Sequence, residues 1–257
     1  MSTLVSDKKS VCVDAEEVGI RFGDTQVISD VSFSVKEGEI FVIMGPSGSG
    51  KSVLLRSVIG LLKPTSGRVL IGGLDASDRQ THEKIKTGLV FQAGALFNSM
   101  SVFDNLAFYP REHRLAKEYD IREKVEQALE MLSLKEAANK IPAELSGGMK
   151  KRVAIARSLV MEPQLLLYDE PTSELDPTMA ATISEVIGTL REELNVTSIV
   201  VSHDRDLAES ISDRMILLKR GTIRASGTAK EVMGSDSEEI EEFFRPEIDV
   251  ENPRFRR

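Results

Sequence analysis

The sequence predicts an α/β fold with a mainly parallel core sheet, a small antiparallel β subdomain and a helical insert. Apolar runs within residues 40–44, 164–170 and 198–204 alternate with helical segments, as parallel strands buried on both faces do. Residues 11–39 instead contain short strands in which apolar and polar positions alternate, which is typical of antiparallel strands. A mainly helical stretch at about 95–160 separates two of the apolar runs.

The elements between these runs follow from local signals. After the first apolar run, SVLLRSVIGLL predicts a helix over 52–62 that Lys63-Pro64 ends. SGRVLIGGLDAS and TGLVFQ predict two further short strands. RMILLKRGTIRASG predicts a hairpin that turns at Arg220-Gly221, and we assign it to the small antiparallel sheet with the N-terminal strands.

One domain, residues 11–235, contains all of these elements, and the helical subdomain at about 95–160 is an insert within it. IREKVEQALEMLSL places its apolar residues at helical spacing, and a second helix is predicted to begin at Ser146. The charged segment 236–257 predicts a short helix followed by a loosely held end. Its two adjacent phenylalanines either pack on their own domain or contact a second copy of the chain.

Composition narrows the class of protein. The chain has 257 residues, 41% hydrophobic and 29% charged, which fits an ordinary globular protein. Its net charge of −8 makes nucleic acid a poor partner, because phosphate binding needs clustered Lys and Arg. Cys12 is the only cysteine, which excludes an intrachain disulfide. The start lacks a signal sequence and no run approaches the roughly 20 apolar residues of a membrane span, so we expect a cytoplasmic protein.

GPSGSGKS matches the phosphate-loop pattern G-x-x-x-x-G-K-[ST] in full, follows an apolar strand and opens a helix. Its glycines allow the backbone N–H groups to face inward and, with the helix N-terminus, to hold phosphate oxygens. Lys51 adds positive charge for the β- and γ-phosphates, and the Ser52 hydroxyl is placed to ligate Mg²⁺. The predicted nucleotide-binding residues here are Gly45, Pro46, Ser47, Gly48, Ser49, Gly50, Lys51 and Ser52.

Four more residues end apolar strands and are catalytic candidates. Asp169 would hold Mg²⁺, and Glu170 after it would accept a proton from an attacking water. Gln92 would contact both Mg²⁺ and that water, and His203 would donate to the γ-phosphate as charge builds up. Taken alone, such a glutamine is more often a surface residue, and such a histidine more often a satisfied residue at a strand end.

These motifs, with LSGGM at 145–149 and SELD at 173–176, occur in an order that resembles the ATP-binding subunit of ABC transporters. The resemblance covers about residues 13–227. It implies an ATPase that works with an integral membrane permease, with LSGGM as the signature motif and SELD as the D-loop. It also implies a homodimer in which each ATP is shared between two copies. The residues it adds to the nucleotide site are Phe22, which would stack on adenine, Asp176 of the D-loop, and Ser146, Gly147 and Gly148 from the second copy.

Met149, where most ABC ATPases have glutamine, and the run at 92–113 look like the ATPases of Mla-type phospholipid transporters, which work with MCE-domain proteins. This resemblance implies a lipid substrate, an MCE-domain partner and a place on the cytoplasmic face of the inner membrane. It also implies that apolar residues after Gln92 form part of a groove for a permease helix, namely Leu96, Phe97, Met100, Val102, Phe103 and Leu106, although several could instead pack internally.

Three alternatives stay open. An ABC importer or exporter ATPase for another substrate would carry the same motifs. A non-transport ABC ATPase acting on DNA or ribosomes usually has long coiled coils or two ATPase domains, and this chain shows one set of motifs and no sustained heptads. A small-molecule phosphotransferase would use the phosphate loop but has no role for LSGG. The sequence does not identify the lipid or its direction of movement.

Overall fold

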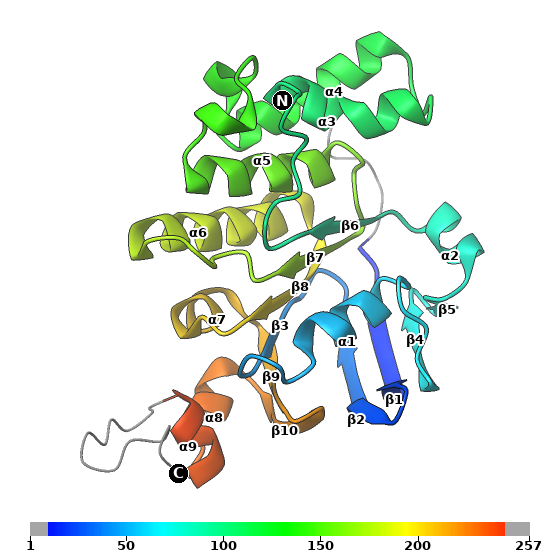
Figure 1. Cartoon of the computed structure of the whole chain (residues 1–257), viewed down its shortest axis with the longest axis vertical. Helices are drawn as coiled ribbons and strands as arrows, with labels where there is room; N and C mark the ends of the chain where they lie inside the picture. The colour runs from blue at the N-terminus through cyan, green and yellow to red at the C-terminus, as the bar shows by residue number, and fades with distance from the viewer. Residues whose placement is uncertain (1–9, 245–257) are drawn as a thin grey trace.

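The structure is a computed structural model that describes residues 10–244, so that residues 1–9 and the end of the predicted tail, 245–257, lie outside the described part. Two β-sheets occupy one end of the molecule and three helices of an insert occupy the other (Figure 1). The predicted fold class, an α/β fold with a mainly parallel core sheet, an antiparallel subdomain and a helical insert, is therefore confirmed.

The main sheet has six strands in the order β10-β9-β3-β8-β7-β6. Its five strands from β9 to β6 are parallel, and β10 is antiparallel to β9. Because parallel neighbours end at the same edge, loops that follow β3, β6, β7 and β8 meet there. The strands are β3 Ile40–Met44, β6 Thr87–Val90, β7 Leu165–Asp169, β8 Thr197–Ser202, β9 Arg214–Lys219 and β10 Thr222–Gly227.

The second sheet has four antiparallel strands in the order β2-β1-β4-β5. Its long strands β1 and β2 form a ribbon interrupted by register shifts, and both carry the alternating burial that the sequence predicts. The strands are β1 Val13–Phe22, β2 Thr25–Val35, β4 Ser66–Ile71 and β5 Leu74–Asp75.

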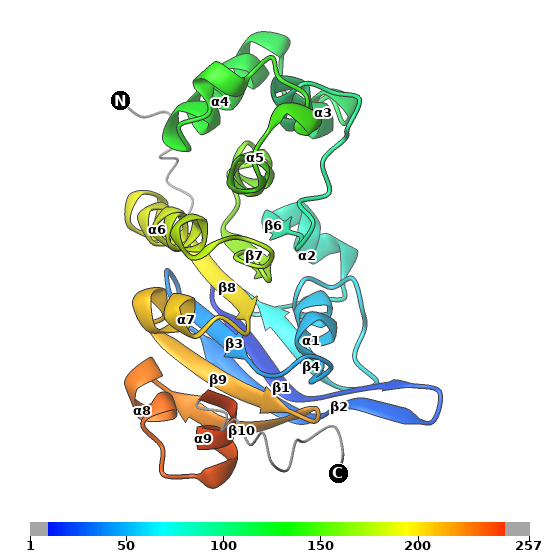
Figure 2. The same ribbon diagram turned by 60° about the vertical axis from the view of Figure 1, so that its left-hand side comes forward.

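The two faces of the main sheet belong to different hydrophobic cores, which is why β3 is apolar at every position. Ile40, Val42 and Met44 face one core, which the helices α6 and α7 cover. Phe41 and Ile43 face the other, which contains α1 and the antiparallel sheet (Figure 2). A strand covered on both faces reads as a continuous apolar run.

The helices fill the connections between strands, and three of them form the predicted insert between β6 and β7. Those three, α3, α4 and α5, bury apolar residues in the same core as α6. The helices are α1 Lys51–Val58, α2 Arg79–Lys84, α3 Val102–Glu112, α4 Glu118–Met131, α5 Gly147–Leu159, α6 Pro177–Leu194, α7 Arg205–Ile211, α8 Ala229–Met233 and α9 Glu238–Phe244, with 3₁₀ turns at Lys135–Ala137 and Pro142–Glu144.

The structure differs from the predictions in three places. The hairpin at Arg220-Gly221 forms, but its strand β9 lies in the main sheet, parallel to β3, so its assignment to the small sheet was wrong. Its apolar run MILL is buried on both faces, as a core strand requires. Helix α1 ends at Val58 instead of continuing to the proline, because Gly60 has a φ of 73°. Helices α2, α7 and α8 were not predicted.

Within the described residues, the tail packs on its own chain. Helix α9 forms as predicted, buries Ile240, and places Phe243 and Phe244 against the core that contains α6. Lys219 of β9 pairs with Glu239 at 3.3 Å and with a second glutamate of α9 at 3.7 Å. The described part of this segment therefore docks on the β9–β10 hairpin.

Candidate active site

The phosphate loop connects β3 to α1, and its two ends pack against protein while its middle does not. A Cβ atom on Gly45 would lie 2.1 Å from the carbonyl oxygen of Leu218, so the loop packs directly on the backbone of β9. Gly50, with φ of 100°, adopts a conformation that glycine tolerates best and caps α1. A Cβ on Gly48 would meet nothing within 4 Å. The loop is thus backed by protein under its ends and open at its middle, as a phosphate cradle must be.

Lys51 is 7% exposed and ties the loop to the catalytic candidates. Its ammonium donates to the carbonyl oxygens of Gly45 at 2.7 Å and Pro46 at 3.3 Å. It also lies 3.4 Å from Oε1 of Glu170, in an ion pair in which both side chains are largely buried. The charge that would meet phosphates is held in this structure by the chain's own carbonyls and carboxylate.

Ser52 and Asp169 bring two oxygen ligands together. The Ser52 hydroxyl, in the first turn of α1, donates to Oδ1 of Asp169 at 2.8 Å. Within residues 10–244 no three acidic, histidine or cysteine side chains gather as an all-protein metal cage. A hydroxyl and one carboxylate fit Mg²⁺, which takes oxygen ligands and completes its shell with substrate phosphates and water. These residues therefore suit a metal that arrives with a nucleotide.

Glu170 and His203 meet because β7 and β8 are adjacent parallel strands. Oε2 of Glu170 accepts the backbone N–H of His203 at 3.3 Å and lies 2.8 Å from Nδ1 of its ring. The Glu170 side chain is 11% exposed and that of His203 is 61% exposed. The carboxylate is therefore sheltered and oriented from two sides, by Lys51 and by His203, and the imidazole faces outward.

Gln92 follows β6 in a turn and has an exposed side chain. In the described chain, no hydrogen bond joins its amide to Ser52, Asp169 or Glu170. Its carbonyl oxygen instead accepts the ammonium of Lys151 at 2.6 Å. The predicted contact of Gln92 with Mg²⁺ and water stays a prediction, although β6 and β7 are neighbours and bring it to the same edge of the sheet.

The signature motif begins helix α5. The Ser146 hydroxyl caps it by accepting the N–H of Met149 at 3.3 Å. Gly147 is exposed and Gly148 is buried; a Cβ on either would lie 3.3 Å from a side chain, that of Leu175 or that of Met179. No hydrogen bond or ion pair between described residues links this motif to the phosphate loop of the same chain. The start of the helix, at Gly147, is therefore exposed on the surface of the chain.

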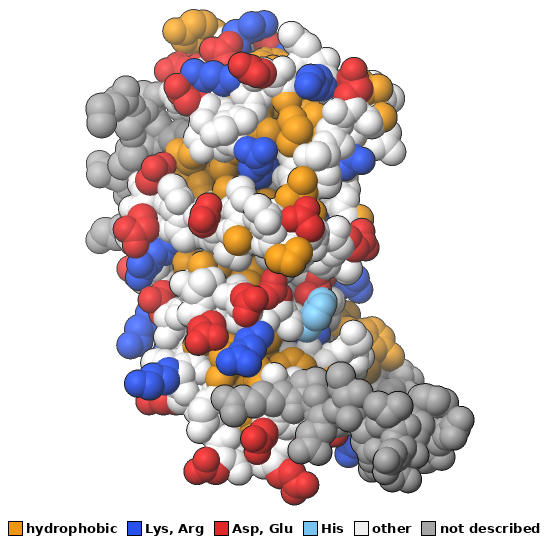
Figure 3. All heavy atoms as spheres, turned by 90° about the vertical axis from the view of Figure 1, so that its left-hand side faces the viewer, with side chains coloured by type: hydrophobic (Ala, Val, Ile, Leu, Met, Phe, Trp, Pro, Cys, Tyr) orange, Lys and Arg blue, Asp and Glu red, His pale blue; other side chains and the backbone are white. Residues whose placement is uncertain are grey.

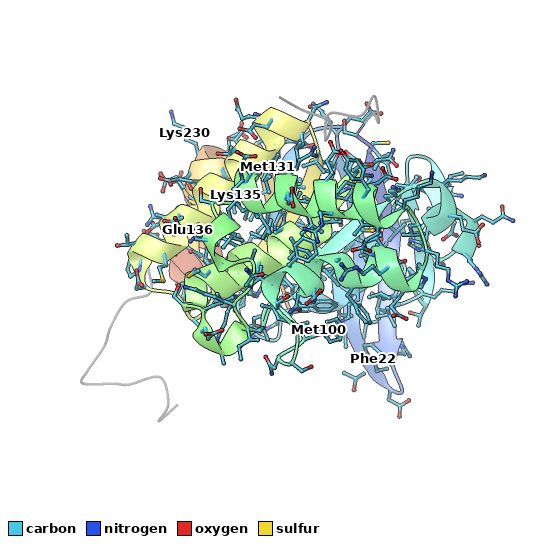
Figure 4. All side chains as sticks on the ribbon, turned by 90° about the horizontal axis from the view of Figure 1, so that it is seen from above. Phe22, Met100, Met131, Lys135, Glu136 and Lys230 are labelled. Atoms are coloured by element: carbon cyan, nitrogen blue, oxygen red, sulfur yellow. The ribbon has the colours of Figure 1, made fainter. Side chains whose placement is uncertain are left out.

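The remaining predicted nucleotide residues lie apart from this cluster. Phe22 ends β1 at the tip of the β1–β2 ribbon, where its ring is 50% exposed and lies at the edge of the molecule (Figure 4). Asp176 caps α6 by accepting the N–H of Met179 at 3.0 Å. Its carboxylate therefore has a local structural role, and a role toward nucleotide stays a prediction.

Sequence reasoning missed Lys151, a buried cation of α5 at the centre of the site. It is 8% exposed and donates to Gln92 in the loop after β6 and to Glu170 and Ser173 in the loop after β7. Burial lowers the pKa of its ammonium, and the charges of Glu174 and Glu170 oppose that shift. One signal was available, since Lys151 lies three residues after buried Gly148 and four before buried Ile155, on the inner face of the helix.

The fold and this arrangement define a nucleotide-binding α/β protein with a phosphate loop. The profile of the ABC transporter family matches residues 28–173. The chain belongs to that family.

Among characterised relatives, the intermembrane phospholipid transport system ATP-binding protein MlaF of Haemophilus influenzae is 39% identical over 92% of this chain and 91% of its own. The Fe(3+) ions import ATP-binding protein FbpC of Rhizobium etli is 40% identical over 94% of this chain and 68% of its own. The probable ribonucleotide transport ATP-binding protein mkl of Mycobacterium leprae is 39% identical over 91% of this chain and 69% of its own. Identity alone does not separate these substrates.

Solved structures agree with the fold. The cbiO1 protein of Clostridium perfringens, part of the ABC transporter complex cbiONQ, has a TM-score of 0.81 and 32% identity, over 93% of this chain and 96% of its own. A dimeric structure of the ATP-binding cassette MJ0796 in a post-hydrolysis state, bound to ADP and Pi, has a TM-score of 0.75 and 33% identity. The match covers 84% of this chain and 98% of the cassette. The chain is thus the ATPase subunit of an ABC transporter and binds ATP with Mg²⁺.

The face of the molecule that carries α6 and α7 has mixed charge (Figure 3). On this face, acidic side chains (red) and basic side chains (blue) are interspersed with one another (Figure 3). No helix between residues 10 and 244 is long and apolar enough to cross a membrane. ABC ATPases dimerise and work with membrane permeases.

Proposed function

We propose that this chain hydrolyses ATP to drive phospholipid movement through an integral membrane permease that works with an MCE-domain protein, at the cytoplasmic face of the inner membrane. The observation that carries the ATPase chemistry is the convergence of Lys51, Ser52, Asp169, Glu170 and His203 at one edge of the sheet. The lipid substrate is supported by Met149, by the run after Gln92 and by the relation to MlaF.

Each side chain has a defined task in this proposal. Lys51 and the loop amides bind the phosphates, while Ser52, Asp169 and Gln92 would hold Mg²⁺, which neutralises phosphate charge when it is bound. Glu170, sheltered and oriented by His203, takes the proton of the attacking water. His203 donates to the γ-phosphate as negative charge develops there.

The proposed active unit is a head-to-tail homodimer, in which Ser146, Gly147 and Gly148 of one copy complete the site of the other. Two observations support it: the motif's capped helix N-terminus is exposed at Gly147, and it makes no polar contact with its own phosphate loop within the described residues. Phe22 would stack on adenine with its exposed ring.

Complementation between two inactive variants tests the shared site. Lys51→Ala removes one copy's phosphate loop, and Ser146→Arg removes the signature of the other, so each homodimer should be inactive. Mixed dimers contain one site built from two intact halves and should recover hydrolysis. If the mixture stays as inactive as either variant alone, although mixed dimers form, the shared site is refuted.

The permease surface is proposed to lie on the insert, just after Gln92. Phe97 is 41% exposed and packs on Phe108 with ring centroids 4.7 Å apart, and Tyr109 is 49% exposed. Met100 also lies at the edge of the insert (Figure 4). Six residues were expected to form the groove or to pack internally. For Val102 and Leu106 the groove prediction is wrong, because both side chains are completely buried in the core. Their burial holds α3 in place beneath the exposed residues.

A buried asparagine keeps this surface in one conformation. The side chain of Asn105 accepts the N–H of Phe97 at 2.8 Å and donates to the carbonyl oxygens of Phe97, Met100 and Ser101 at 2.9–3.2 Å. The loop is thus ordered before a partner arrives, which lowers the entropy lost on binding.

Affinity purification of the full chain from its native membranes, solubilised in mild detergent, tests the substrate proposal. We expect a permease and an MCE-domain protein to be recovered, and phospholipid vesicles to stimulate the ATPase activity of that complex. A Phe97→Ser chain should lose the permease, while a Tyr119→Ser chain, altered at a more exposed residue on α4, serves as the control. Recovery of a permease with a substrate-binding protein for metal ions would favour an importer instead. Recovery of ribosomes or DNA would refute transport.

A further inference from the structure

Helix α5 buries one ammonium group that contacts two loops, the one after β6 and the one after β7. Nζ of Lys151 donates to the carbonyl oxygen of Gln92 at 2.6 Å, to the hydroxyl of Ser173 at 3.2 Å and to the carbonyl oxygen of Glu170 at 3.4 Å. An ammonium has three N–H donors, so its capacity is fully used. Ser173 in turn donates to the Glu170 carbonyl at 2.8 Å, which closes the network.

The partners of Lys151 are not generic core groups. Gln92 begins the loop between the main sheet and the insert, Glu170 is the proposed base, and Ser173 opens the D-loop. The lysine touches the first two through backbone carbonyl oxygens, so it fixes the path of the main chain and leaves both side chains free to act. Its own helix begins with the signature motif.

The same helix holds the rest of the loop after Gln92. The guanidinium of Arg157 donates to the carbonyl oxygens of Ala95 at 2.7 Å and Gly94 at 3.0 Å. Both of those residues have positive φ, 48° and 72°. Two side chains of α5 therefore bind the backbone of residues 92–95, and a displacement of α5 would move this loop with it.

A purely structural role explains this placement poorly. Burying a charge costs free energy unless it is paired and hydrogen-bonded, and an apolar side chain of similar length would fill the space beside α5 without that cost. Only a long side chain with hydrogen-bond donors, such as Lys151, links the loop after β6 to the loop after β7 in this way.

We propose that Lys151 is a positioning residue for ATP hydrolysis, which holds the main chain at Glu170 in register with the Gln92 loop and the D-loop. When α5 moves, because its signature end meets a nucleotide of the second copy or because a permease moves the insert, Lys151 carries that movement to the base. The inference rests on the proposed role of Glu170 and adds the connection by which that role is controlled.

The test compares Lys151→Met, which keeps the length and removes the donors, with Lys151→Gln, which keeps a neutral donor. Lys150→Met is the matched control, since its neighbour Lys150 is exposed on the same helix. We expect Lys151→Met to lower kcat about tenfold or more, as the loss of a charged hydrogen bond near the reacting groups allows, and to leave the Kd for ATP within about twofold. Lys151→Gln should recover part of kcat, and Lys150→Met should match wild type.

A double-mutant cycle separates this inference from the proposed function. If Lys151 acts through Glu170, adding Lys151→Met to Glu170→Gln should slow turnover no further. Normal turnover of Glu170→Gln would remove the base and so refute the proposed mechanism. Slow turnover of Glu170→Gln with wild-type kcat in Lys151→Met would refute the positioning role alone. If Lys151→Met fails to fold, Lys151→Gln takes its place in the comparison and in the cycle. A kcat of Lys151→Gln equal to that of the Lys150→Met control then refutes the positioning role.

Discussion

The ion pair between Lys51 and Glu170 leads to a prediction about nucleotide binding that is separate from catalysis. Glu170 pairs with the Lys51 ammonium, which must instead contact the phosphates when a nucleotide binds. Glu170→Gln should therefore bind nucleotide more tightly than wild type. The substitution keeps the size and shape of the side chain and removes its charge. It also leaves Lys51 in the free chain without a charged partner, beside the neutral carbonyl oxygens of Gly45 and Pro46, which raises the free energy of that state.

The magnitude follows from the geometry. Two unit charges 3.4 Å apart attract by about 5 kcal/mol at an effective dielectric constant of 20. Most of this is offset, since the glutamine oxygen still accepts a hydrogen bond and phosphate restores a partner to Lys51. We therefore expect about 1–2 kcal/mol of tighter binding, which is roughly a 5- to 30-fold lower Kd.

ADP is the ligand that isolates this effect. ADP needs the same lysine but has no γ-phosphate, so neither dimer closure nor repulsion of the γ-phosphate by Glu170 contributes. Isothermal titration of ADP into Glu170→Gln, wild type and Glu185→Gln provides the comparison. The last variant removes the same charge from an exposed position on α6 and should behave as wild type. An unchanged or higher Kd in Glu170→Gln would show that the ion pair does not compete with phosphate, and the reasoning would fail.

Three further predictions concern stability, each measured by chemical denaturation. Asn105→Ala should lower the free energy of unfolding by about 1–3 kcal/mol, because it leaves partly buried backbone groups of the loop at Phe97 without their side-chain partner; a change below about 0.5 kcal/mol would contradict this. Gly50→Ala should cost at least about 1–2 kcal/mol, since the residue has φ of 100° and its Cβ would lie 2.5 Å from Cδ1 of Ile28. The third prediction concerns Asp104, whose pKa is lowered by a hydrogen bond from Ser101 and by the neighbouring Arg111. Partial burial opposes this shift without reversing it. The Asp104 carboxylate therefore stabilises the fold above its ordinary pKa and loses that effect as pH falls through the lowered value, so wild type and Asp104→Asn should converge below about pH 4.

Much of the fold could be predicted because burial leaves a direct trace in the sequence. The runs at 40–44 and 165–168 are apolar at every position since both faces of those strands are covered, and β1 and β2 alternate since one face is not. The catalytic candidates could be predicted for a related reason. A polar residue that directly follows a buried parallel strand must lie at one edge of the sheet.

The errors have physical causes too. The MILL run of β9 was read as part of an attached hairpin because a tight turn at Arg220-Gly221 indicates antiparallel pairing with β10, and it does pair so. Nothing local reveals that the other edge of β9 is parallel to β3, a strand some 170 residues earlier in the chain. Lys151 was missed for a similar reason, since its three acceptors lie in segments distant in sequence, and two of them are backbone oxygens that no side-chain pattern encodes.

The topology is consistent with the proposal that the signature motif acts on a second copy while the other site residues act within one chain. The phosphate loop, Gln92, Glu170 and His203 follow β3, β6, β7 and β8, which are consecutive neighbours in the order β3-β8-β7-β6, so a single chain brings them to one edge. The signature motif follows no strand of this sheet. It begins a helix of the insert, between β6 and β7, and makes no polar contact with the phosphate loop within the described residues. In the proposed dimer, this helix N-terminus would meet an anion bound to the other copy. Lys151, about one turn further along the same helix, would then connect the position of the helix to Glu170 of its own chain.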